Sequence, residues 1–218
     1  MATTWGAGTS LWGALTGWAL NNTANPTEYQ REVAASKTNN AIASELYDGR
    51  KDISETFYAI DRDAAPVIPA AIGLLNSLTL TSIAITTTKD NFASMVLGGH
   101  DHVDGTDNDT ITVARSVAHS MILDAAFGVS DFGFTDVTEI TESSCSIDCD
   151  HAEVPDADGD TAAGENHNPR ITISITAYDG VATPPAGFEV TASRPSTDAQ
   201  GFNTTVTEAA KDLAFSEA

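Results

Sequence analysis

Two segments in which apolar and polar residues strictly alternate constrain the fold most. In "RITISITAY", residues 170–178, isoleucine occupies positions 171, 173 and 175, with threonine and serine between them. "SSCSIDCD", residues 143–150, places Cys145, Ile147 and Cys149 on one face in the same way. A repeat of two residues is typical of a β-strand with one face buried and the other in contact with solvent. Both segments are therefore predicted to be strands of one sheet.

Other segments extend this pattern, and helical signals are few. "LTLTSIAITTT", residues 78–88, is rich in β-branched residues, and residues 110–123 carry apolar side chains at odd positions, so both are predicted to be strands. A short helix is expected at 70–76, after a proline. Asp48-Gly49 predicts a hairpin turn between two strands, and Thr207 could cap one or two helical turns.

These elements predict a mainly β protein: an antiparallel β-sandwich or barrel with one short α-helix, long interstrand loops and extended termini. The chain of 218 residues fits a single domain, 1–218. Within it we expect an N-terminal arm rich in tryptophan and glycine, 1–25, and a C-terminal extension, 181–218. Two loops of about twenty residues, 90–109 and 150–169, are long for hairpins, and loops of that length commonly serve function or contacts.

The charge of the chain is strongly one-sided. It has 31 acidic and 10 basic residues, for a net charge of −21. Such a charge destabilises a compact state by self-repulsion unless salt screens it. One interpretation is adaptation to high salt, and a compatible one is an acidic surface that lets DNA pass without sticking. A protein that clamps phosphates is disfavoured because the sequence has no basic patch.

The N-terminus and the cysteines bear on the compartment. No apolar run approaches the roughly 20 residues of a membrane span, and no basic residue precedes the mildly apolar N-terminus, so neither an integral membrane protein nor a secretory signal is expected. The chain should stay where it is made, or leave inside a particle or by lysis. Cys145 and Cys149 would lie about 13 Å apart on a strand, too far for a disulfide. We expect two reduced thiols packed in the core.

An acidic stretch offers a candidate cation site. Asp156, Asp158 and Asp160 form D-x-D-x-D, which resembles the start of an EF-hand loop. The sixth position is Thr161 instead of glycine, and the twelfth is His167 instead of a bidentate glutamate, so an EF-hand is excluded. A looser Ca²⁺ or Mg²⁺ site and a solvated turn both remain open.

Two histidines offer a second candidate metal site. His100 and His102 would share one face of a strand, and a third ligand could come from His151 or His167. No H-E-x-x-H or C-x-x-C motif accompanies them, so ordinary polar contacts are the alternative. The sequence also has no nucleophile motif of the G-x-S-x-G kind and no phosphate-binding loop. We therefore predict a protein that is not an enzyme and that needs no cofactor.

Three tryptophans stand near the N-terminus. Trp5, Trp12 and Trp18 lie in a segment without charge before Glu28. They could pack on the core of their own chain, or form an arm that buries against a neighbouring subunit, because tryptophan supplies a large contact area. The sequence leaves both alternatives open.

Several stretches, taken in order along most of the chain, carry a resemblance to a known family. "MATTWGAGT", "ELYDGRKDISETFYAI", "GHDHVDG", "FGVSDFGF" and "CDHAEVPDADGDTAAGENHNPRITISI" resemble the small structural proteins of tailed viruses, most of all tail tube proteins. The resemblance implies a β-sandwich subunit that forms hexameric rings, which stack into a hollow tube for genomic DNA. The acidic composition would suit a virus of a halophilic host.

The resemblance also implies partners and a location. The partners would be further copies of the chain and other tail proteins, with DNA sliding unbound past lumenal carboxylates and no membrane involved. The protein would be assembled in the host cytoplasm and reside in the virion tail. A capsid decoration or head–tail connector protein, or a Ca²⁺-binding β-domain, remains the alternative. The candidate subunit contacts come from the ends and the second long loop: Trp5, Trp12, Trp18, His151, Glu165 and His167.

Overall fold

A computed structural model describes residues 10–24, 27–35, 41–76, 78–102, 112–113, 116–121, 123–155, 161–178, 182–197, 199 and 201–215. Side chains are described for a smaller set, which leaves out those of residues 27–50. Twelve strands make up the regular structure: β1 (Trp18–Ala24), β2 (Thr27–Ala35), β3 (Ala41–Ala59), β4 (Ala71–Leu75), β5 (Leu78–Thr88), β6 (Ser94–His102), β7 (Thr112–Val113), β8 (Val117–Ala118), β9 (Thr138–Pro155), β10 (Thr161–Tyr178), β11 (Glu189–Thr197) and β12 (Asn203–Asp212).

The alternating segments form the centre of a mainly β, sandwich-like fold, as the sequence predicts. β9 pairs with β10 and with β5 in antiparallel register, so that Ile147 lies opposite both Ile171 and Ile83. These side chains point to one face, where burial of apolar surface is the main stabilising term. The same face carries further buried residues of the central strands: Ile53, Phe57, Ile85, Met95, Leu97, Cys145, Ile173 and Ile175.

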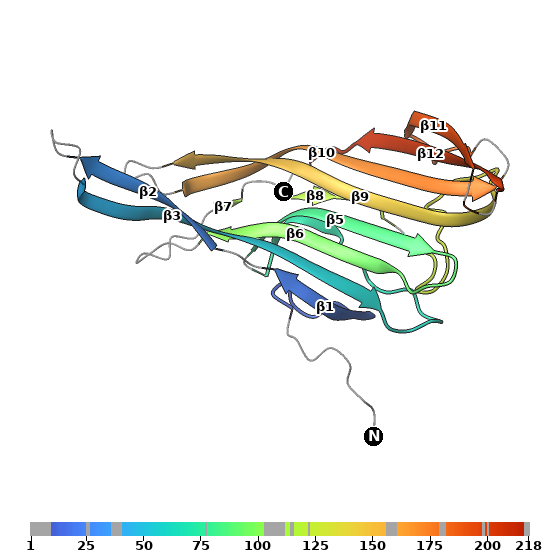
Figure 1. The fold of residues 1–218 in the computed structure, drawn as a ribbon, viewed down its shortest axis with the longest axis horizontal. Helices are drawn as coiled ribbons and strands as arrows, with labels where there is room; N and C mark the ends of the chain where they lie inside the picture. Colours follow the sequence, from blue (N-terminus) through green and yellow to red (C-terminus); the bar gives the residue numbers. More distant parts are fainter. Residues whose placement is uncertain are drawn as a thin grey trace, which may run out of the picture.

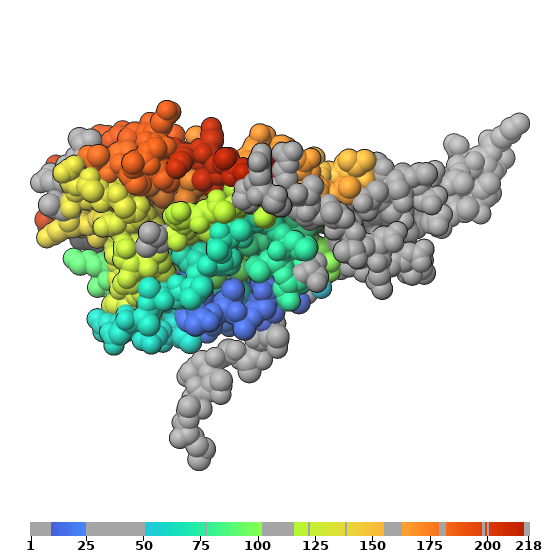
Figure 2. Space-filling model, turned by 180° about the vertical axis from the view of Figure 1, so that it is seen from behind, coloured from blue at the N-terminus to red at the C-terminus, as the bar shows by residue number. Residues whose placement is uncertain are grey.

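The main sheet is long and open (Figure 1). Its strands follow the order β1-β3-β6-β5-β9-β10-β12-β11. In the described part of the chain β1 and β11 lie at opposite ends of this order, so the sheet does not close into a barrel. Figure 2 shows the molecule from behind, with described N-terminal residues along one side and C-terminal residues along the other. The two ends of the order leave backbone hydrogen-bonding groups at the sheet edges.

A smaller layer covers the buried face. β4 pairs with β8, and Ile72 and Val117 from these strands are fully buried in the core. Residues 123–134 complete the cover, with Leu123, Phe132 and Phe134 in the same cluster. The two layers make the fold sandwich-like rather than a single exposed sheet.

A buried hydroxyl network ties this cover to the main sheet. Thr87 Oγ1 and Ser143 Oγ lie 2.6 Å apart, and the Ser130 backbone N–H donates to Thr87 Oγ1 at 3.0 Å. Ser143 Oγ donates to the Ser130 carbonyl at 2.5 Å. Because each buried hydroxyl has a partner, the network fixes the covering segment without the penalty of unsatisfied polar groups.

The N-terminal residues pack on the chain's own core. Trp12 and Trp18 are buried, and Trp18 Nε1 donates to the Val67 carbonyl at 2.9 Å. Trp12 lies very close to Gly99: a Cβ atom added to Gly99 would lie 2.7 Å from the indole ring of Trp12. Of the two alternatives for these tryptophans, the structure therefore favours packing within the chain. Trp5 lies outside the described residues.

A buried carboxylate holds this segment in place. Glu55, on β3, is fully buried and accepts hydrogen bonds from Ser10 Oγ at 2.5 Å, Leu11 N at 3.1 Å and Thr23 Oγ1 at 3.0 Å. A charged group inside a protein is tolerated when donors replace its water. Glu55 thus fastens the segment before β1, and β1 itself, to the third strand.

Two hairpin arms extend beyond the shared sheet toward the same end of the molecule (Figure 1). The first arm consists of β2 and residues 41–49 of β3, and the second of residues 149–155 of β9 and 161–168 of β10. β6 stops pairing with β3 at Arg50, and β5 stops pairing with β9 at Asp148. Beyond these points each arm is largely a two-stranded ribbon, an arrangement that is only marginally stable alone.

The structure corrects several local predictions. Residues 71–75 of the predicted helix 70–76 form β4, because pairing with β5 and β8 outweighs the local helix signal after the proline. Asp48-Gly49 lies within the continuous strand β3 instead of a hairpin turn, since β2 supplies its partner. Thr207 lies inside β12, so the predicted C-terminal helical turns are wrong. No helix occurs among the described residues.

The predicted loops and termini also change. Residues 110–123 are not one long strand: their described part contains only the two-residue strands β7 and β8. β6 occupies much of the expected loop 90–109, and β9 and β10 extend far into the expected loop 150–169. β12 pairs with β10 over nine residue pairs, so the region after 181 belongs to the main sheet instead of forming an extension. In the second arm the alternating apolar pattern is missing, because the buried positions described on β10 are Gly164 and Asn166 instead of large apolar residues.

In the described residues, no helix has the length and apolar character that crossing a membrane requires.

Candidate metal centre

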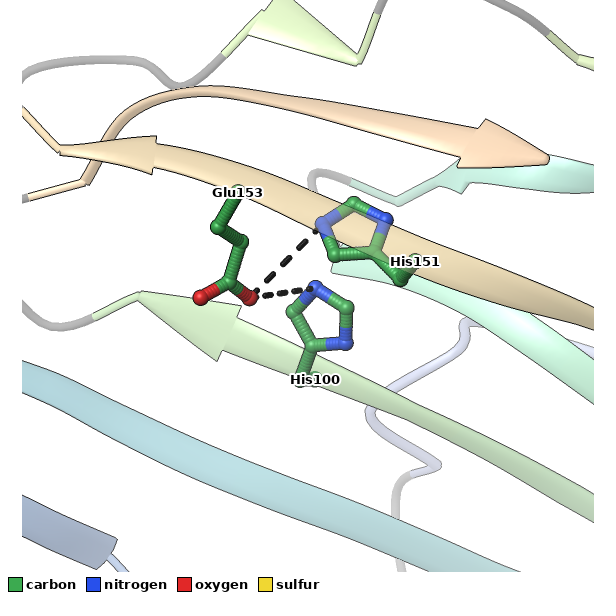
Figure 3. Close-up of side chains that lie close together, drawn as sticks. All are labelled: His100, His151 and Glu153. Carbon is green, nitrogen blue, oxygen red and sulfur yellow. Dashed lines mark ion pairs between the residues drawn. The ribbon is translucent and has the colours of Figure 1, made fainter.

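Three side chains of types that can ligate a metal ion meet where the two arms separate (Figure 3). His100 comes from the end of β6, and His151 and Glu153 come from β9. β5 separates β6 from β9 in the sheet as far as the Ser82–Asp148 pair, after which β9 continues without it. β5 still pairs with β6 at His100, through Thr79, so it is β9 that separates from β5 beyond Asp148 and brings His151 and Glu153 next to His100.

The donor atoms of the three residues converge. Glu153 Oε1 lies 3.9 Å from His100 Nε2 and 3.7 Å from His151 Nε2, and one donor atom from each residue lies within 4.8 Å of the others. The two imidazole rings are 4.4 Å apart between centroids, tilted by 58°. The side chain of His100 is 1% exposed, that of His151 7%, and that of Glu153 22%. Two imidazoles and one carboxylate form a donor set that suits a divalent transition metal.

A fourth side chain orients His151. Its Nδ1 lies 2.7 Å from Oδ1 of Asn166, which is fully buried on β10. With the amide oxygen facing the ring, His151 donates from Nδ1, and in the neutral imidazole Nε2 then carries the lone pair on the side of Glu153. His151 Nε2 has no hydrogen-bond partner in the described part of the protein. This arrangement matches the outer hydrogen bond that usually orients a metal-binding histidine.

A β-bulge decides which residue of β10 faces the cluster. The pairing of β10 with β9 shifts between His167 and Arg170, so Asn168 and Pro169 together oppose Cys149. Asn168 adopts a positive φ of 49°, and its Nδ2 donates to Asp150 Oδ2 at 3.0 Å. The shift reverses the alternation of β10 at this point. As a result Asn166, and not His167, lies next to His151.

The sequence-predicted metal candidates have different outcomes. The structure brings His100 and His151 together, and His151 was one of the two residues considered as a third ligand. His102 ends β6, but its side chain lies outside the described residues, as do Asp156, Asp158 and Asp160. His167 is not a partner of His100: its side chain is 44% exposed and lies 3.8 Å from Asp150. Glu165 is exposed on the second arm.

Sequence reasoning missed Glu153 and Asn166. Glu153 stands two residues after His151, and an H-x-E pair on a strand places both side chains on one face. That signal was available once 150–155 was taken as strand rather than loop. Asn166 could not be found by alternation from the isoleucines of β10, since the bulge lies between them.

The two cysteines are excluded from this chemistry. Both are free, as predicted, with Cys145 buried and Cys149 half-buried. Burial raises the pKa of the Cys145 thiol to about 12. Burial, and then the neighbouring Asp148 and Asp150 carboxylates, raise the pKa of Cys149 to about 12 as well. Only the thiolate form of cysteine acts as a metal ligand or a nucleophile, so both thiols are unreactive at neutral pH.

A second feature is an uncharged face on the outer side of the main sheet, which we call the Ser/Thr face. It spans five adjacent strands in two rows of residues paired in register. Its members are Thr56, Val96, Ala84, Ser146 and Thr172 in one row, and Tyr58, Ser94, Thr86, Ser144 and Ser174 in the other. None of them is charged, although the chain carries a net charge of −21.

No family model matches this chain, and no curated protein is significantly similar to it. The fold and the site therefore define only a class, a sandwich-like mainly β protein with a buried histidine–carboxylate cluster.

Proposed function

We propose that this protein is a virion structural subunit of the tail tube type, which assembles with identical copies into stacked rings around a conduit for DNA. The observation that carries the proposal is the Ser/Thr face. Surfaces buried between subunits are depleted in charge, whereas a solvated surface of so acidic a chain is expected to carry carboxylates. Tyr58 and Val96 are 45% and 37% exposed on this face, which gives it apolar contact area for a neighbour.

The sheet edges and the arms support the same proposal. The edges at β1 and β11 are open in the described chain, and pairing between copies would satisfy their backbone groups. The arms are largely two-stranded, and contact with an adjacent subunit would stabilise them. The resemblance in sequence to tail tube proteins is the reason for proposing this family. The acidic composition fits a lumen that repels phosphate.

The oligomeric state tests the proposal. Light scattering and negative-stain electron microscopy of the purified protein, in molar salt and in dilute buffer, should reveal rings or tubes with six-fold symmetry. Monomers under every condition would overturn it. Imaging of labelled virions would separate a tube subunit from a capsid decoration or head–tail connector protein.

A pair of variants locates the contact. Val96→Lys places a charge in the middle of the Ser/Thr face, and Val67→Lys places the same charge at a valine that is 59% exposed outside it. Both variants lower the net negative charge equally, so general repulsion falls in both. We expect Val96→Lys to abolish assembly and Val67→Lys to retain it. Equal assembly of the two variants would exclude the Ser/Thr face as the contact.

A further inference from the structure

We propose that His100, His151 and Glu153 bind one divalent transition metal ion of the zinc class, and that this ion clamps the second arm to β6. The cluster bridges strands that are not hydrogen-bonded to each other (Figure 3). β6 pairs with β3, which continues into the first arm, and β9 continues into the second. An ion held by β6 and β9 would thus join the two arms at the point where they diverge.

The geometry is close to that of a metal site. Tetrahedral zinc with ligand distances near 2.0–2.1 Å separates its ligand atoms by about 3.3–3.4 Å. The two nitrogen–oxygen distances here are 3.7 and 3.9 Å. A contraction of about half an ångström or less would bring both to that spacing, and the two imidazoles, whose donor atoms lie within 4.8 Å of each other, would also have to approach by side-chain rotation. The fourth position remains for water or another donor.

An independent observation points to a cation. The Asn166 contact places the proton of His151 on Nδ1, so a nitrogen lone pair and a carboxylate oxygen face each other. The His151 side chain is more than nine-tenths buried, and its Nε2 has no hydrogen-bond partner among the described residues. Two electron-rich atoms in a mostly buried site repel each other unless a positive charge lies between them. Either a proton on Nε2 or a metal ion supplies that charge, and a metal ion uses both lone pairs; the zinc-binding measurements below distinguish the two.

The donor set selects the kind of ion. Imidazole nitrogen suits zinc, copper, nickel and iron, whereas Ca²⁺ and Mg²⁺ prefer sets made of oxygen. The many surface carboxylates of the chain will bind Mg²⁺ and Ca²⁺ weakly, so an excess of Mg²⁺ masks them. Binding that persists in excess Mg²⁺ therefore reports the histidine cluster.

The first test measures zinc binding by calorimetry on EDTA-treated full-length protein, in molar potassium nitrate with excess Mg²⁺. We expect one equivalent to bind saturably. Glu153→Gln and His151→Gln should each weaken binding at least tenfold. His167→Gln is the matched control, because it removes a histidine from the same arm outside the cluster. Absence of saturable binding, or equal losses in the control, would overturn the proposal.

Two further readouts separate metal binding from a merely structural role. Co²⁺ in place of Zn²⁺ should give the intense visible absorption of a four-coordinate site, and Glu153→Gln should lose it. Asn166→Ala should weaken zinc binding about 10–100-fold, as expected for a lost outer hydrogen bond, while Asn166→Asp should retain it. Should His151→Gln fail to fold, the partly exposed Glu153→Gln still decides the outcome.

The clamp itself is tested by hydrogen exchange. Zinc should slow exchange of the backbone amides in residues 149–155 and 161–168, and leave the amides of β5 unchanged. The effect should disappear in Glu153→Gln. Zinc binding without any protection of the second arm would overturn the clamp. These measurements use the dissociated protein, so they stand apart from the outcome of the assembly experiment.

Discussion

The centre of the main sheet and the junction of the two arms are held together by different forces. At the centre, Ile83, Ile147 and Ile171 from adjacent strands lie side by side and are almost fully buried. At the junction, the buried side chains of β6, β9 and β10 are instead His100, His151 and Asn166. The same long strands therefore pass from an apolar environment to a polar one along their length.

Because of this difference, the two regions should depend differently on pH, salt and metal ions. Apolar burial depends little on pH or on particular ions, and salts that strengthen it act on the whole core. A cluster of imidazoles and a carboxylate depends on protons and metal ions. We therefore expect the centre to set the stability of the fold and the junction to set the order of the arms. The predictions below test the centre, from the largest effect to the smallest.

The largest effect should come from Ile147→Ala at the centre. Ile147 is fully buried, and its truncation leaves a cavity between three strands. Such substitutions cost about 2–5 kcal/mol of the free energy of unfolding. Ile60→Ala is the control, since Ile60 is 61% exposed and should change stability by less than about 0.5 kcal/mol. Urea denaturation in molar salt measures both, and similar losses would mean that the centre is not the stabilising region.

A smaller loss is expected from Glu55→Gln, which tests a polar site inside the centre. The amide would replace one acceptor oxygen of a buried carboxylate that accepts from Ser10, Leu11 and Thr23. Weakened hydrogen bonds to a charged group cost about 1.5–3 kcal/mol. Limited proteolysis should then cut the segment before β1 more rapidly than in the wild type. Glu142→Gln, an exposed position on β9, should change neither stability nor cleavage.

The pH dependence of His119 should be weaker still. Burial lowers the pKa of His119 below 6.5, and neither ring nitrogen has a hydrogen-bond partner in the described part of the protein. The unfolded chain therefore takes up a proton before the folded protein does. Stability is fully present above pH 6.5 and is lost as the pH falls from 6.5 through the lower pKa of the folded state.

His119→Asn isolates this contribution. The free energies of unfolding of the wild type and the variant, measured between pH 8 and pH 5, should differ by an amount that changes below pH 6.5. A difference that stays constant over this range would show that His119 does not couple protonation to folding.

The smallest effect concerns the thiols. With a pKa of about 12, each cysteine is a thiolate in only about one molecule in ten thousand at pH 8. Labelling by a thiol reagent should be slow in the native protein and complete after unfolding in urea. Rapid native labelling of the half-buried Cys149 would show that this end of the centre opens readily.

The sequence predicts the central strands well because they are half-buried. "LTLTSIAITTT" becomes β5 with the predicted bounds, and the isoleucines of 170–178 face the core as expected. The predicted helix 70–76 failed because cross-strand pairing decided its structure, and that pairing is not visible locally. Strand structure around Asp48-Gly49 was predicted, but as two strands joined by a turn, because the pairing of β2 with β3 through this dipeptide is not visible locally.

Only part of the metal cluster could be predicted, because the rest depends on strand pairing that is not visible locally. His100 and His151 were named as possible ligands of one ion, but their meeting depends on where β5 stops pairing with β9. The bulge at Asn168 and Pro169 then exchanges His167 for Asn166. With both residues kept but no bulge, regular pairing would place His167 instead of Asn166 opposite His151, and the spacing of residues in the sequence does not reveal the bulge.

The three longest strands have a mechanical consequence. β3, β9 and β10 contain 19, 18 and 18 residues, so each runs about 60 Å without a break from the core to an arm. A pull on an arm along its strands would load many interstrand hydrogen bonds in shear at once, instead of opening them one after another. The molecule should therefore be stiff lengthwise and yield first to forces that peel the two ribbons apart.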